Sequence, residues 1–261
     1  MRKKLWTILL TVFVFLSGAI LGVSTVYRVK DVTVNVAYVT EDARLKGEIL
    51  QQKLQEAYEE ECTFFVNKKA AEEILKEYPY FRLSGFEKSY PKRLVLEVTE
   101  NAEMYAIEGL SGKEYCILSG DGIVLEVRDN PLNPLNGEEN VVMKGLNVKA
   151  TRGEVPQGDK CFAPMLAVCN ELSKQLNGIR SNVVSIEVVR SSPEIILRVV
   201  TREGVKLYFS SPDKLTAEKV AEAVQCYKGL SDEEKLMGRI LLVENHGEIF
   251  SSYSAVDEFA S

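Results

Sequence analysis

Hydrophobic residues between positions 29 and 101 recur with two different periods. In the stretch KDVTVNVAYV, apolar residues alternate with polar ones, which is typical of a strand with one buried face. Two stretches with apolar residues near helical spacing follow; Asn67 is the predicted N-cap of the second, which ends at Pro79. The sequence GFEKSYPKRLVLEVTE predicts two strands joined at a Tyr-Pro turn. This order predicts a compact α+β module, with two helices on one face of a three-stranded sheet. The predicted elements are a strand at 30–39, helices at 41–60 and 68–78, and strands on either side of Pro91.

The chain from residue 102 to residue 253 has a different pattern, in which short apolar stretches alternate with amphipathic helices. Asp121 and Gly122 favour a tight turn with positive φ inside a hairpin. The pattern predicts a mixed α/β domain with an extended antiparallel sheet, followed by a flexible tail over residues 254–261. The predicted elements are a hairpin at 113–127, a helix at 162–178, strands at 182–190, 194–200 and 204–210, a helix at 216–230 and a hairpin at 239–253.

An uncharged apolar run extends from Leu5 to Val26 and contains no proline. At about 1.5 Å per residue, a helix of this length crosses a hydrocarbon core about 30 Å thick, so the run predicts a retained transmembrane helix over residues 5–26. The basic residues before it predict a cytoplasmic tail over residues 1–4 and a single-pass type II protein with an extracytoplasmic C-terminal region. A cleaved signal peptide is the alternative, although its apolar core is usually shorter, at about 7–15 residues.

The composition argues against several classes of partner and site. The formal net charge is −6, and the chain is more acidic still without the basic residues at its N-terminus. We predict no nucleic-acid partner, because phosphate contacts need clustered Lys and Arg. The five cysteines include no Cys-x-x-Cys pair. This spacing indicates small, partly buried residues and leaves one disulfide open.

Residues that carry catalysis or bind metals are scarce in this sequence. His246 is the only histidine, and it lies in a predicted turn without cysteines at zinc-ligand spacing. No G-x-S-x-G elbow supplies a serine nucleophile, and a Cys–His pair with Cys226 would need spatial proximity. The SGDG stretch lacks the spacing of a phosphate-binding loop, and the acidic runs lack the ligand pattern of a calcium loop. We therefore predict no catalytic residue, cofactor or metal.

The last predicted hairpin carries two aromatic residues, Phe250 and Tyr253. A strand at the end of a folded region often lies at a sheet edge, where its backbone groups are open to a partner strand. The alternative is that both side chains pack in the core. The pattern supports the two interpretations equally.

The order of these pieces resembles the FtsQ/DivIB family of bacterial cell-division proteins. A short basic N-terminus and a single span precede a β-α-α-β-β module that is similar to a POTRA domain, over residues 29–101. The stretches FFVNKKAAEEILKEYPYF and FEKSYPKRLVLEVTE resemble the family's F-x-V link, second helix and Tyr-Pro strand pair. EYCILSGDGIVLE, the helix KLTAEKVAEAV and the terminal hairpin resemble parts of the family's β domain, here residues 102–253. The resemblance covers nearly the whole chain.

The chain departs from the family pattern at three places. ENAEMYA keeps Glu100 of the usual Glu-Arg/Lys-x-Pro-x-Ala stretch but lacks its proline. Ser119 stands where an aspartate is usual. The third departure falls in the terminal hairpin, where RILLVENHG lacks the aspartate of the family's Ile-Asp-(Leu/Val)-Arg run.

The resemblance implies a non-enzymatic divisome scaffold in the cell membrane at the division septum. Its partners would be FtsL-type and DivIC/FtsB-type bitopic division proteins, with which it would help to assemble septal peptidoglycan synthesis. In this family the partner segment adds next to the last strands of the β domain. The resemblance therefore assigns partner binding to Glu248, Ile249, Phe250, Ser252 and Tyr253.

Two other functions remain as alternatives. A membrane-anchored cell-wall hydrolase or transferase would need a cleft with a nucleophile or with carboxyl groups of perturbed pKa. A substrate-binding module for secretion or outer-membrane assembly is the third interpretation, because POTRA-like domains also occur there.

Overall fold

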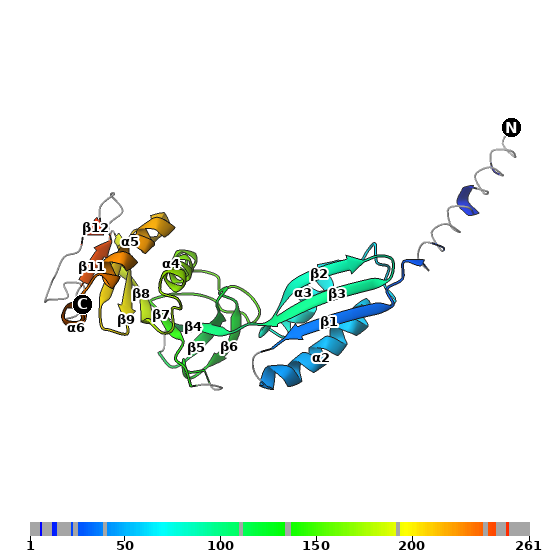
Figure 1. Cartoon of the computed structure of the whole chain (residues 1–261), viewed down its shortest axis with the longest axis horizontal. Helices are drawn as coiled ribbons and strands as arrows, with labels where there is room; N and C mark the ends of the chain where they lie inside the picture. The colour runs from blue at the N-terminus through cyan, green and yellow to red at the C-terminus, as the bar shows by residue number, and fades with distance from the viewer. Residues whose placement is uncertain are drawn as a thin grey trace. The chain divides into compact units, whose positions relative to one another are not determined.

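The computed structural model of the chain is α+β with mixed sheets, and it divides into two compact units, residues 1–101 and 102–261 (Figure 1). The structure describes residues 6, 12–14, 22, 26–38, 41–109, 112–133, 137–191, 194–236, 240–243 and 249–250.

The predicted transmembrane helix over residues 5–26 is wrong as far as the structure describes the chain. None of the helices in the described ranges is both long enough and apolar enough to cross a membrane. The longest of them, α2 (Glu41–Tyr58), has 18 residues and carries charged side chains along its whole length, whereas a crossing helix needs about 20 predominantly apolar residues. Most of the predicted span lies outside the described residues.

The first unit contains the predicted order of strand, helix, helix, strand, strand. Its sheet has three strands in the order β1-β3-β2. β3 pairs in parallel with β1 and antiparallel with β2. The buried Leu94, Leu96 and Val98 of β3 pack against the helices, because alternate strand residues point to the same face. Besides α2, the elements of this unit are β1 (Asp31–Ala37), α3 (Lys68–Lys76), β2 (Phe81–Ser89) and β3 (Arg93–Glu100).

The N-terminus of α3 is fixed by two side chains. The Asn67 side chain accepts a hydrogen bond of 2.9 Å from the amide of Lys69, so the predicted N-cap is confirmed. The hydroxyl of the buried Tyr58, at the end of α2, accepts a bond of 2.9 Å from the amide of Ala71 and donates one of 2.7 Å to the carbonyl of Asn67. Tyr58 therefore joins the two helices and satisfies a buried donor in the first turns of α3.

Replacing Tyr58 with Phe is expected to lower the free energy of unfolding of the first unit by about 1–3 kcal/mol, because the buried amide of Ala71 loses its partner. Urea unfolding followed by circular dichroism measures this change. Tyr38→Phe, at an exposed position after β1, is the matched control and should leave stability unchanged. Equal stability of the two variants would show that the Tyr58 hydroxyl does not fix α3.

The second unit is built on a sheet whose described strands number nine, in the order β12-β11-β10-β9-β8-β7-β4-β5-β6. Its first half contains β4 (Glu103–Glu108), β5 (Tyr115–Ser119), β6 (Val124–Arg128), β7 (Val141–Lys144) and α4 (Phe162–Gln175). Its second half contains β8 (Val183–Ser191), β9 (Glu194–Thr201), β10 (Lys206–Ser210), the short η1 (Pro212–Lys214), α5 (Ala217–Lys228), α6 (Asp232–Leu236), β11 (Ile240–Val243) and β12 (Ile249–Phe250).

The predicted extended antiparallel sheet is wrong, because this sheet is mixed. β4–β7, β7–β8 and β10–β11 are parallel pairs, and the other pairs are antiparallel. Parallel neighbours need a long crossover connection, which is usually a helix. Here α4 lies in the connection from β7 to β8, and α5 lies in the connection from β10 to β11.

The core of the second unit lies between the sheet and its two longer helices. α4 contributes Met165, Cys169 and Leu172, and the sheet contributes Met143 and Leu207 among others, all of them buried. α4 and α5 contact each other beside the strands (Figure 1). The helices that make the parallel crossovers are thus the same ones that cover this face of the sheet.

A buried ion pair holds β6 to β4. Arg128 Nη2 lies 2.6 Å from Glu103 Oε2, Arg128 Nη1 lies 3.0 Å from Glu103 Oε1, and Asn140 donates a further bond of 3.0 Å to Glu103. Burial lowers the pKa of Arg128, but its bonds to Glu103 and Glu126 outweigh this and raise it. The charged form of the pair is therefore favoured in the folded chain.

Replacing Arg128 with Ala is expected to lower the free energy of unfolding of the second unit by about 3–5 kcal/mol, because Glu103 is left as a buried charge without its cation. The matched control is Lys68→Ala, which removes an exposed ion pair with Glu72 and should cost less than about 1 kcal/mol. Chemical denaturation of both variants measures the difference. A loss at Arg128 as small as that at Lys68 would contradict the role of the buried pair.

Candidate partner-binding edge

β12 is the last strand of the nine-stranded sheet at one of its two edges. It pairs antiparallel with β11 through Leu242–Phe250 and Val243–Ile249. Among the described residues, no further strand pairs with the outer side of β12. Backbone N–H and C=O groups on the outer side of such a strand are open to a partner strand.

The position of β11, and through it of β12, is set by α5. Thr216 caps this helix by accepting a bond of 3.4 Å from the amide of Lys219. One face of α5 is buried against the core through Val220, Ala223, Val224 and Tyr227. α5 also contacts β11 and β12. The candidate edge is therefore supported from one side by a packed helix.

A cluster of side-chain contacts at the end of α5 fixes the position of the chain shortly before β11 begins. The Tyr227 hydroxyl donates a hydrogen bond to Glu203, in the turn between β9 and β10. Lys235 of α6 lies 3.1 Å from the same carboxylate, and its ammonium group lies 5.2 Å from the centre of the Tyr227 ring. Burial, and then the bond to Glu203, raises the pKa of Tyr227 to about 12. These contacts connect α5 and α6 to the antiparallel part of the sheet.

Residues that lie opposite one another on neighbouring strands form rows across the sheet. Phe250 and Ile249 of β12 belong to different rows. Phe250 belongs to what we call the polar row, the register-matched positions Glu187, Arg198, Tyr208, Leu242 and Phe250. Ile249 belongs to the core row, the register-matched positions Val188, Leu197, Phe209, Val243 and Ile249. Leu197 and Phe209 are completely buried in the main core.

The polar row contains an ion pair in the middle of the sheet. Arg198 contacts the carboxylate of Glu187 on the neighbouring strand, and Tyr208 on the other side is buried. Burial lowers the pKa of Arg198, but its hydrogen bonds with Glu187 and Tyr208 outweigh this effect and raise it. The row that leads to Phe250 thus contains a charged pair, whereas Val188, Leu197 and Phe209 of the core row are apolar and buried.

The opposite edge of the sheet, at β6, is partly covered. The amide of Val124 donates a bond of 2.9 Å to the carbonyl of Glu154, and the carbonyl of Val124 accepts one of 2.8 Å from the amide of Gly153. The side chain of Arg152 donates a further bond of 3.2 Å to the carbonyl of Leu125. Because these groups are already paired, β6 offers fewer of them to a partner strand than an open edge would.

Of the predicted partner-binding residues, the structure brings Ile249 and Phe250 to this edge. Glu248, Ser252 and Tyr253 lie outside the described residues, as does His246. Sequence reasoning did not identify Glu187, Arg198 or Tyr208 as neighbours in the row of Phe250. The alternation within each strand was visible, but the register between strands was not.

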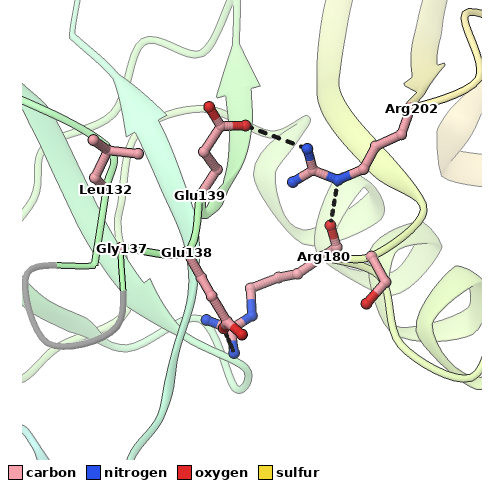
Figure 2. A pocket seen from close by; sticks show the side chains of 7 residues that line it. Leu132, Gly137, Glu138, Glu139, Arg180 and Arg202 are labelled. Atoms are coloured by element: carbon pink, nitrogen blue, oxygen red, sulfur yellow. Dashed lines mark hydrogen bonds and ion pairs between the residues drawn. The ribbon is translucent and has the colours of Figure 1, made fainter.

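A polar pocket of about 660 Å³ in the second unit is a separate candidate site. Figure 2 shows Glu139 facing Arg202 across it, with Arg180 beside Glu138. The paired atoms of Arg202 and Glu139 are 3.3 Å apart, and those of Arg180 and Glu138 are 2.7 Å apart. An anionic ligand would have to compete with these two carboxylates for the arginines. Its lining residues are Leu132, Gly137, Glu138, Glu139, Arg180, Ser181 and Arg202.

The cysteines and acidic groups in the described part of the chain offer little support for a reactive or metal-binding site. All five cysteines are free, so the disulfide that the sequence left open is not formed. Burial raises the pKa of Cys116 to about 11 and also raises the pKa of Cys161 and Cys169, which disfavours the nucleophilic thiolate. Within the described ranges, no group of three or more His, Cys, Asp or Glu side chains is placed to hold a metal ion.

Comparison with known proteins adds no family assignment. No protein-family model matches the chain, and no curated protein matches it. The relationship to the FtsQ/DivIB family therefore stays a prediction from the motifs of the sequence.

The contacts among Tyr227, Glu203 and Lys235 predict that the stability of the second unit depends on pH. The hydrogen bond from Tyr227, and then Lys235, lowers the pKa of Glu203 from its ordinary value of 4.5. A carboxyl group with a lowered pKa stabilises the fold above its unfolded pKa and loses this contribution as the pH falls through its folded pKa. Tyr227→Phe is therefore expected to destabilise the second unit by about 1 kcal/mol at neutral pH. The difference from the unmodified chain should shrink below pH 4.5.

Thermal unfolding of both proteins across this pH range measures the effect. Tyr115→Phe, in β5, is the control, and its difference from the unmodified chain should not depend on pH. A Tyr227→Phe effect that is the same at acid and neutral pH would contradict the assigned contribution of Glu203.

Proposed function

We propose that this chain is a non-enzymatic scaffold of the bacterial divisome, which binds FtsL-type and DivIC/FtsB-type partners by strand addition at β12. In this role it helps to assemble septal peptidoglycan synthesis. The observation that carries the proposal is the position of β12 at the edge of the sheet. The motifs that resemble the FtsQ/DivIB family supply the identity of the partners.

Three features of the second unit support strand addition at β12 rather than elsewhere on this sheet. β12 ends the sheet, whereas backbone groups of β6 at the other edge are paired with residues 153 and 154. α5 packs beside β11 and β12 and holds the edge in place. A partner strand would gain main-chain hydrogen bonds for affinity, and side chains near the edge would select the partner.

Replacing Phe250 with Lys tests the proposed edge. The position lies in the polar row, so the fold should tolerate the charge, whereas Ile249→Lys would place a charge in the core row. Partner affinity should fall about tenfold or more, because the added ammonium group must lose its water at the interface. Isothermal titration calorimetry of the purified full chain with the exported segments of the two partners measures this change.

Val127→Lys is the matched control, since Val127 is an exposed residue of β6 at the other edge of the same sheet. It should bind the partners as the unmodified chain does. Normal binding by Phe250→Lys would place the site elsewhere, and loss of binding by Val127→Lys alone would place it at β6. A folded chain that binds neither partner would contradict the scaffold itself.

Hydrogen exchange provides a second readout of the same proposal. Pairing with a partner strand should slow amide exchange in β12 and leave β6 unchanged, because only the paired backbone becomes protected. Binding without slower exchange in β12 would mean that the partner uses side-chain contacts rather than strand addition.

A further inference from the structure

Four aromatic residues form a cluster at one end of the first unit. We call Tyr27, Phe64, Phe65 and Tyr90 the aromatic cluster. They come from three separate segments: the chain before β1, the link between α2 and α3, and the turn between β2 and β3. These segments meet because β1 and β3 start at the same end of the sheet, where β2 ends.

Three rings of this cluster, those of Tyr27, Phe64 and Tyr90, are packed together, and Phe65 follows Phe64 in the chain. The ring centroids of Tyr27 and Phe64 are 4.4 Å apart, and those of Phe64 and Tyr90 are 5.4 Å apart. The exposed fractions are 80% for Phe65, 55% for Tyr90 and 47% for Phe64. Single exposed apolar residues are ordinary, but contiguous exposed aromatic surface marks an interaction site.

The backbone under the cluster is held by one buried residue. Thr63 is completely buried, and its amide donates a bond of 2.7 Å to the carbonyl of Tyr27. Its hydroxyl oxygen lies 2.7 Å from the carbonyl oxygen of Pro91 and 2.8 Å from that of Tyr27. Thr63 thus connects all three segments, so the aromatic surface is formed before anything binds to it.

The sequence that leads into the cluster is apolar, and its described large side chains are exposed. The uncharged run of residues 5–26 ends one residue before Tyr27. Its described large side chains are all apolar and at least half exposed: Trp6, Val12, Phe13, Val14 and Val26. The last of these residues, Val26, directly precedes Tyr27 of the aromatic cluster.

Exposed basic side chains lie close to the cluster. Arg28 and Lys30 follow Tyr27 and are exposed. Arg28 Nη1 lies 3.4 Å from Glu60 Oε2. The ammonium group of Lys88 lies 3.4 Å from the carbonyl oxygen of Phe64, beside the rings. Tyrosine rings flanked by Lys and Arg are enriched where acyl chains meet phosphate groups.

We propose that the aromatic cluster contacts a lipid bilayer at the boundary between its headgroups and acyl chains. Phe65, the most exposed ring, enters the acyl region, and the hydroxyl groups of Tyr27 and Tyr90 remain among the headgroups. This contact is independent of the partner strand proposed for β12, and it needs no helix that crosses the bilayer.

The single tryptophan of the chain makes a direct test possible, because moving it places one fluorophore at a chosen position. The probe protein is the full chain with Trp6→Phe and Phe65→Trp. It is mixed with phosphatidylglycerol–phosphatidylethanolamine vesicles that contain lipids brominated near the headgroup end of the acyl chain. About half of its emission should be lost, with a shift to shorter wavelength, because bromine quenches fluorophores at that depth.

The matched control carries Trp6→Phe and Tyr38→Trp, since Tyr38 is exposed and follows the other end of β1. Both proteins keep the apolar run, so both meet the vesicles in the same way, and the control should lose little emission. Equal quenching at the two positions would overturn the proposal. So would a blue shift of the Phe65→Trp probe that appears only with a partner protein. Trp6→Phe with Tyr90→Trp repeats the test if circular dichroism shows that the first probe is unfolded.

Discussion

The parallel pairing of β10 with β11 is the constraint on which the candidate edge depends. A parallel neighbour cannot be reached by a tight turn, so the chain passes through α5 before it returns to the sheet. α5 buries its apolar face on the way and contacts both of the last strands. β12 then follows β11 as an antiparallel strand and ends the sheet. The position of the edge is thus a consequence of one crossover.

The two edge strands of this sheet differ in the contacts that they make with the rest of the second unit. β6 is joined to β4 by the buried pair of Arg128 and Glu103, and its backbone at Val124 is occupied by a neighbouring turn. β12 is contacted by α5. Among the described residues, the edge at β6 is therefore partly paired and the edge at β12 is not, and an unpaired edge can accept a further strand.

The elements with strong local signals could be predicted from sequence, and those that depend on distant contacts could not. Asn67 caps α3 as its residue type indicates. β7 was missed, because four residues of apolar pattern after a long loop carry little periodicity. The mixed character of the sheet was missed too, although a helix between two strands is itself a signal for parallel pairing. The contact of Arg128 with Glu103 and the row from Glu187 to Phe250 depend on strand register, which no local pattern encodes.

The crossover through α5 also has a consequence for the order in which the protein is made. During synthesis, β10 leaves the ribosome before α5 and well before β11. A sheet that formed before those elements were made would end at β10, which carries the apolar residues Leu207, Tyr208 and Phe209. Such a nascent chain would present an apolar strand to other chains, which is the kind of surface that chaperones bind. Once β11 and β12 have been added, β10 is paired on both sides and β12 lies at the edge of the sheet instead.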